Sequence, residues 1–218
     1  MDASVNQNSS GDCATTIPTG HQVHRQDSKI LTVKDAKQKY RESHADESGY
    51  RDLVTLLIDS GFPKPFKNDS YYDALVLTEA MFERSNREIR WLTGSGTDGF
   101  VVELYDTFVA TLERIRAAGG KVRIVMLSDQ RPVQICDLMK QFPDTLQVAL
   151  AKPLSKLQHF IVCDSKIVRV ENTHENLSDL SGAHEVKAEV YFNNPEKANM
   201  LNTFFDAIWT AVKPVILK

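Results

Sequence analysis

The strongest chemical pattern in the chain is one histidine placed directly before an apolar run that ends in an acid. The segment reads LQHFIVCD over residues 157–164, with His159 before the run and Asp164 at its end. An imidazole titrates near neutral pH, so it can act as a nucleophile or as a general acid or base. His159 and Asp164 are therefore candidate catalytic residues. A structural interpretation stays open, in which His159 bonds a backbone carbonyl and Asp164 turns a hairpin into Ser165 and Lys166.

Two other polar segments could bind a ligand. The segment SDQR over residues 128–131 follows a strongly apolar stretch, and open α/β sheets bind ligands beyond the ends of such strands. We favour a helix cap there, formed by Ser128 or Asp129 with Pro132 near the first turn. The segment TGSGT over residues 93–97 has the composition of a phosphate-cradling loop but lacks its lysine and its full glycine pattern.

The histidines predict no metal site, and no cofactor is expected. Three of them lie in polar segments and are predicted to be solvated: His21, His24 and His44. His174 and His184 flank a loop and could join His159, but their spacing matches no known set of metal ligands.

Alternating helix and strand patterns must position these side chains. Six apolar residues recur at helical spacing: Val101, Leu104, Tyr105, Phe108, Leu112 and Ile115. Gly119 and Gly120 end that helix, and residues 121–127 then carry apolar side chains on both faces, as expected of a covered central strand. A weaker helix over 132–142 and a strand over 146–150 repeat the order, which is α/β alternation.

Further elements are expected on both sides of this unit. Helices over 50–58 and from Ser70 to near Ser85 precede it, with a strand over 88–92. Three strand candidates follow without a long helix between them, over 160–163, 166–170 and 186–192. Asn194 caps and Pro195 opens a final helix. The sequence therefore predicts an α/β fold, a mixed β-sheet flanked by helices.

The composition is that of an ordinary soluble protein. The chain has 218 residues, of which 42% are hydrophobic and 25% charged, and no run reaches the roughly 18 apolar residues of a membrane span. A net charge of −3 gives no overall attraction to phosphate backbones, so nucleic-acid binding needs a local basic patch. Three cysteines leave one unpaired in any disulfide scheme and no signal sequence is recognised, so a cytoplasmic location is expected.

The chain divides into three expected regions. Residues 1–27 form a polar tail that we expect to be disordered, and residues 28–68 form a charged segment with an accessory helix. The α/β domain is expected over residues 69–218.

Residues 71–212 resemble the phospholipase D superfamily, whose members carry an HxKxxxxD (HKD) motif and a downstream Gly-Ser-x-Asn. The resemblance is carried by EIRWL over 88–92, AAGGKVRI over 117–124 and VYFNNPE over 190–196 with the helix after it. It implies a phospholipase D-like fold. It also implies phosphodiester chemistry, in which one histidine attacks phosphorus, a second protonates the leaving oxygen, and lysine and asparagine stabilise the phosphoryl charge.

The motif itself is degenerate in this chain. If the strand ending in Asp164 is aligned with the family, Leu157 takes the histidine position and His159 takes the lysine position. If His159 is aligned with the family histidine, Ile161 takes the lysine position and Lys166 takes the aspartate position. Neither register keeps all three residues, and a leucine performs none of their roles.

The resemblance implies further ligand-binding candidates. In the first register the Gly-Ser-x-Asn site falls on residues 171–174, where Glu171 and Asn172 keep polar groups, and Glu185 is a further acid. The family site is built from two motifs across a two-fold axis, so a chain with a single motif is expected to form a homodimer in which His159 faces its mate. Lys166 and Arg169 are then phosphate binders, and their odd separation allows only one of them to line the site.

Two functions follow from the resemblance. We favour a non-catalytic dimeric binding or interaction module with affinity for phosphate-bearing ligands, nucleic acid among them. The alternative is a divergent metal-independent phosphodiesterase, a nuclease or phospholipid hydrolase, that uses His159 across the homodimer. A stand-alone α/β regulator outside that family is a third interpretation.

Overall fold

The computed structural model describes residues 47–68, 70–94, 100–128, 131–152, 158–172 and 187–212, so the expected tail and most of the charged segment lie outside the described residues. The helices are α2 (Glu47–Asp59), α3 (Tyr71–Arg84), α4 (Phe100–Glu103), α5 (Tyr105–Ala117), α6 (Val133–Gln141) and α7 (Pro195–Val212). The strands are β1 (Phe66–Asn68), β2 (Glu88–Thr93), β3 (Lys121–Leu127), β4 (Leu146–Ala151), β5 (Phe160–Cys163), β6 (Ile167–Glu171) and β7 (Ala188–Tyr191). The predicted α/β class is confirmed.

The strands form one mixed sheet in the order β1-β7-β6-β5-β2-β3-β4. Strands β2, β3 and β4 are parallel, whereas β5, β6, β7 and β1 pair antiparallel, and β2 joins the two halves. Helices lie between the parallel strands along the chain, as parallel pairing requires, while a tight turn suffices between β5 and β6. Strand β3 was expected at the centre of the sheet. It is an interior strand, but it lies next to the edge strand β4.

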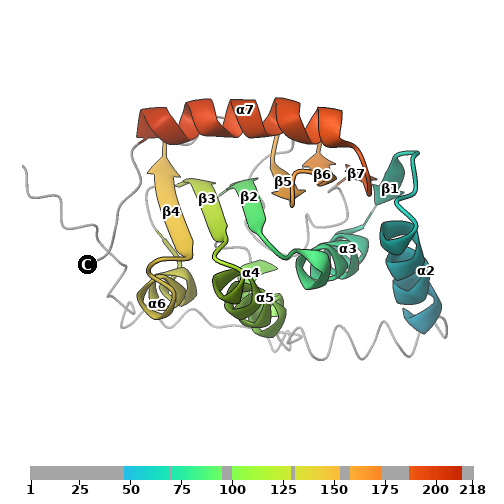
Figure 1. Cartoon of the computed structure of the whole chain (residues 1–218), viewed down its shortest axis with the longest axis horizontal. Coiled ribbons are helices and arrows are strands. Elements are labelled where there is room, and N and C mark those ends of the chain that lie inside the picture. Colours follow the sequence, from blue (N-terminus) through green and yellow to red (C-terminus); the bar gives the residue numbers. More distant parts are fainter. Residues whose placement is uncertain are drawn as a thin grey trace, which may run out of the picture.

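The sheet has a hydrophobic core on each face (Figure 1). On one face the larger core packs the helices from α2 through α6 against the sheet. On the other face α7 alone crosses the strands. Alternate residues of β5 show the division, since Ile161 belongs to the first core and Phe160 to the second. Side chains on β5 and β6 therefore face either the helical layer or α7.

Local signals in the sequence explain where most elements begin and end. The Ser70 hydroxyl accepts a hydrogen bond from Asp73 N at 3.0 Å, and Asn194 Oδ1 accepts one from Lys197 N at 2.9 Å, so the expected helix start at Ser70 and the predicted cap at Asn194 are confirmed. Gly119 takes a φ of +67° at the end of α5. A Cβ on the following Gly120 would lie 1.9 Å from the carbonyl oxygen of Arg87, so only glycine fits there.

Two expectations differ from the structure. The single helix expected over 101–115 is divided into α4 and α5, because Leu104 leaves the helical region with φ −95° and ψ 10°. Its apolar stripe survives the break, since Val101, Leu104 and Phe108 are all buried. Strand β1 was not expected at all, because it has three residues and follows prolines that indicate a break.

Candidate functional site

His159, Arg169 and Glu171 meet on one face of the antiparallel half of the sheet. The register pairs Ile161 with Arg169, and Glu171 N donates to His159 O at 2.9 Å, so all three polar side chains share the face that carries the larger core. Nδ1 of His159 lies 3.2 Å from Oε2 of Glu171, while Oε1 of Glu171 accepts a hydrogen bond from Nη1 of Arg169. One carboxylate therefore joins the histidine to the arginine.

Arg169 is held inside the protein. It is 1% exposed, and its Nε donates to Oδ1 of Asn68, itself fully buried on β1, at 3.3 Å. Its ion pair with Glu171 supplies the counter-charge that a buried guanidinium requires. The side chains of His159 and Glu171 are each 15% exposed, so only this end of the cluster reaches solvent.

The electrostatics of this cluster disfavour a bound phosphate. The guanidinium of Arg169 and the carboxylate of Glu171 cancel in formal charge. A phosphate oxygen would also compete with the carboxylate for the same donors, and internal charge-assisted hydrogen bonds of this kind are strong. The arrangement can orient His159 through Glu171, but it presents no open cluster of cations.

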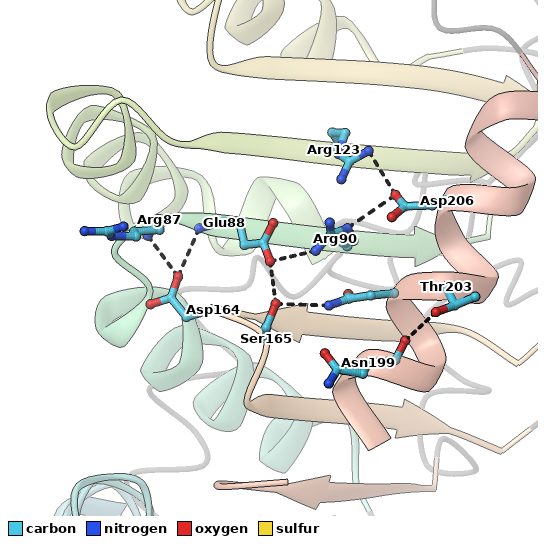
Figure 2. Close-up of polar contacts among 10 residues, drawn as sticks. Arg87, Glu88, Arg90, Arg123, Asp164, Ser165, Asn199, Thr203 and Asp206 are labelled. Atoms are coloured by element: carbon cyan, nitrogen blue, oxygen red, sulfur yellow. Dashed lines mark hydrogen bonds and ion pairs between the residues drawn. The ribbon is translucent and has the colours of Figure 1, made fainter. Parts of the chain in front are cut away.

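Asp164 lies at the opposite end of β5 from His159. Asp164 and Ser165 have φ angles of 48° and 54°, and Lys166 N donates to Cys163 O at 3.1 Å, which closes a tight turn into β6. The Asp164 carboxylate accepts backbone hydrogen bonds from Asn86, Arg87 and Glu88 at 2.8, 2.8 and 2.9 Å. Figure 2 shows the contacts with Arg87 and Glu88. Its contacts are those of a turn that anchors a loop.

The other expected ligand-binding residues are dispersed. Lys166 is exposed in the same turn, so of the two predicted phosphate binders it is Arg169 that lies with His159. Asn172 is exposed just after β6, and its N donates to Lys187 O at 2.8 Å. Glu185 and Leu157 lie outside the described residues, as do residues 95–97 of the glycine-rich loop.

The helix cap expected from Ser128 is wrong, and Asp129 lies outside the described residues. Helix α6 has Pro132 as its N-cap and no side-chain capping hydrogen bond. Proline has no side-chain acceptor and its backbone lacks an N–H, so this helix begins without the polar cap that the segment offered.

A second polar network, missed from the sequence, lies between the sheet and α7 (Figure 2). Asp206 of α7 pairs with Nη1 of Arg123 at 3.0 Å and with Nε of Arg90 at 3.5 Å, and Nη1 of Arg90 also bonds Glu88 at 2.6 Å. Arg90 and Arg123 are register partners in β2 and β3. Two arginines side by side in a sheet need an anion between them, and this signal could have predicted the role of Asp206.

The described residues contain no group of three or more histidine, cysteine, aspartate or glutamate side chains that could hold a metal ion; His174 and His184 lie outside them. Across the same residues, no helix combines the length and hydropathy needed to cross a membrane.

Comparisons with known proteins identify the fold. No family model and no curated protein matches the chain. Among solved structures, the archaeal chromatin protein TrmBL2, whose structure shows a novel mode of DNA binding, is similar with a TM-score of 0.52 and 17% identity, over 85% of this chain and 68% of that one. Nuc from Salmonella typhimurium, a phospholipase D family member, is similar with a TM-score of 0.52 and 16% identity, over 71% of this chain and 100% of that one.

NucT from Helicobacter pylori is similar with a TM-score of 0.50 and 16% identity, over 71% of this chain and 99% of that one. At such identities the likeness shows the fold alone. The chain has a phospholipase D-like α/β fold, as its sequence resemblance implied.

Proposed function

We propose that this chain is a non-catalytic binding module with a phospholipase D-like fold, which acts as a homodimer and binds a phosphate-bearing ligand. The observation that carries the proposal is the Glu171 carboxylate, which engages both His159 and Arg169. Phosphoryl transfer through a covalent intermediate needs a nucleophile with a free lone pair and cations that meet the developing negative charge. Here an internal anion takes the place of that charge.

The sequence departure supports the same conclusion. With Asp164 in the motif aspartate position, the nucleophile position holds Leu157, which has neither a lone pair nor a proton to transfer. His159 then stands in the lysine position, beside a carboxylate where the family has Gly-Ser-x-Asn. Both changes remove catalytic groups and leave the fold unchanged.

The ligand class rests on chemistry and on the structural neighbours. A phosphate is the group that phospholipase D-like sites handle, and the neighbour TrmBL2 is described as a DNA-binding chromatin protein. With a net charge of −3, this chain has to bind such a ligand through local cationic groups.

The outer face of α7 suits contact with a second copy. Met200 is 60% exposed and Phe204 is 42% exposed. From residue 198 to residue 212 the sole charged residue is Asp206, which pairs with arginines of the sheet. In a two-fold contact residues near the axis meet their own copies, so a face without outward charge avoids like-charge repulsion. The ring of Phe204 lies 6.3 Å from that of Phe160, whose side chain faces α7, so this contact lies on the face of the sheet opposite to the one that carries the His159 cluster.

A divergent metal-independent phosphodiesterase, a nuclease or a phospholipid hydrolase, is the second candidate. It is favoured by the contact between Nδ1 of His159 and Glu171 at 3.2 Å, since a carboxylate that orients an imidazole is common in acid–base catalysis. In that case the His159 side chains of two copies act as nucleophile and acid.

One experiment separates the two candidates. Fluorescence anisotropy with an end-labelled single-stranded oligonucleotide of about 20 nucleotides, in EDTA, measures binding, and a denaturing gel of the same samples measures cleavage. We expect binding with the oligonucleotide intact. Cleavage that is lost in His159→Ala establishes the phosphodiesterase. Absence of binding by nucleic acid, together with absence of binding by anionic phospholipid vesicles, contradicts the ligand class.

A further inference from the structure

Arg131 is a buried guanidinium without an acceptor. It is 2% exposed and ranks with Arg169 among the largest fully buried side chains. Its Nε and Nη2 have no hydrogen-bond partner among the residues that the structure describes. Burial lowers the pKa of Arg131, but an arginine stays protonated in proteins, so the site holds a full positive charge.

The other arginines packed into the protein differ from Arg131 in this respect. Arg169 has Glu171 and Asn68, and Arg114 donates to the carbonyl oxygens of Ser85 and Phe82. A buried charge that lacks a partner is strongly unfavourable, and it is retained in proteins where an anion neutralises it. The unpaired state of Arg131 therefore points to an anion on a bound ligand.

The two free donors define the shape of that anion. The N–H groups of Nε and Nη2 lie on the same edge of the planar guanidinium and point in parallel. Such an edge binds two oxygens carried by one central atom, as in a phosphate or a carboxylate, through two parallel hydrogen bonds. Both donors of this edge are buried and unpaired in Arg131, so the whole edge lacks an acceptor.

The position of Arg131 in the fold fits a ligand site. It follows β3, which lies between β2 and β4 in the parallel half of the sheet. In open α/β sheets ligands bind beyond the carboxyl ends of parallel strands. Helix α6 begins two residues later with Pro132 as N-cap and no side-chain cap, so the positive end of its dipole adds to the attraction for an anion.

We propose that Arg131 is the centre of an oxyanion site at the carboxyl end of β3, which binds the phosphate group of the ligand side-on through Nε and Nη2. This inference rests on the proposed function and names the place where the phosphate is held. It separates that place from the family motif position, because His159 and Arg169 are already engaged by Glu171.

Calorimetric titration of the full chain with inorganic phosphate tests the inference. We expect one phosphate per chain, at least a tenfold loss of affinity in Arg131→Lys, because an ammonium offers no parallel pair of donors, and no measurable binding in Arg131→Met. Arg87→Met is the matched control, because Arg87 is exposed. The Arg87→Met variant should bind phosphate with the affinity of the wild type. A parallel titration with acetate shows whether the site prefers a carboxylate or a phosphate. Tighter binding of acetate than of phosphate overturns the phosphate assignment.

Thermal unfolding keeps the test decisive if a variant folds poorly. In phosphate-free buffer we expect Arg131→Met to unfold at the wild-type temperature or above it, because an unpaired buried charge has been removed, and phosphate should raise the unfolding temperature of the wild type alone. A large fall in the unfolding temperature of Arg131→Met, or unchanged phosphate binding in Arg131→Lys, overturns the inference. If the oligonucleotide binds the wild type and Arg131→Met equally, the inference fails and the proposed function stands; if the wild type binds neither probe nor vesicles, both fail.

Discussion

Replacing Glu171 by glutamine removes the anion from the candidate site and should destabilise the protein strongly. Arg169 is 1% exposed, so it cannot regain solvation when its counter-charge is lost. Breaking a buried pair by removing one partner costs about 3–5 kcal/mol. Glutamine keeps an oxygen that can accept from Arg169, and the Glu171 side chain is 15% exposed, so we expect the lower end, a loss of about 3 kcal/mol.

Equilibrium unfolding in urea measures this change at one fixed protein concentration. With a slope of about 2 kcal/mol per molar for a domain of this size, the midpoint should fall by about 1.5 M. Glu189→Gln is the matched control: Glu189 lies on the neighbouring strand β7 and accepts from the Tyr191 hydroxyl at 2.6 Å, a neutral donor. Its loss should stay within about 1 kcal/mol.

A double variant isolates the pairwise term. Arg169→Met combined with Glu171→Leu removes both charges, and replacing a buried ion pair by apolar side chains is often neutral or stabilising. We therefore expect the double variant to be more stable than Arg169→Met alone or Glu171→Leu alone by about 2 kcal/mol. Equal losses in Glu171→Gln and Glu189→Gln, or strictly additive effects in the double variant, would refute the assignment of Glu171 as the internal counter-ion.

Three further outcomes are expected. Hydrogen bonding to Glu189 raises the pKa of Tyr191 from 10.0 to about 12, so the contribution of this contact to stability is present below pH 10 and is lost as the pH rises through 12. Urea unfolding of the wild type and of Tyr191→Phe should therefore show a smaller wild-type advantage at pH 11 than at pH 9. A constant difference between the two proteins argues against the contact. Burial raises the pKa of the Cys163 thiol to about 12, so iodoacetamide at pH 8 should leave Cys163 unmodified until urea unfolds the chain. Peptide mass spectrometry measures the modification. Modification of Cys163 in the native protein contradicts its burial. Phe204→Glu places like charges at the α7 contact and should convert dimer to monomer in sedimentation velocity, and an unchanged dimer moves the interface elsewhere.

Much of the fold could be predicted because its signals are local. Strand β5 was located to the residue, since a short apolar run with both faces covered ends at a tight turn. The caps at Ser70 and Asn194 followed from side-chain chemistry alone. Strand β1 escaped because its three residues gain their conformation from pairing with β7, far along the chain, and the sequence shows only the nearby prolines.

The candidate site depends on contacts that sequence shows less directly. The meeting of His159 and Glu171 is set by the register of β5 with β6, which follows once the turn at Asp164 is known. The role of Asn68 could not be found without β1. The burial of Arg131 runs against the ordinary exposure of arginine, so only the tertiary structure reveals it.

The rate at which the purified wild type hydrolyses bis(p-nitrophenyl) phosphate in EDTA shows whether this phospholipase D-like chain is a catalyst. The His159→Ala variant is measured under the same conditions. We predict that both proteins give the rate of the protein-free blank, because Leu157 occupies the nucleophile position and Glu171 already engages the cationic group of Arg169. Hydrolysis by the wild type above the blank that disappears in His159→Ala would contradict the claim and establish a phosphodiesterase.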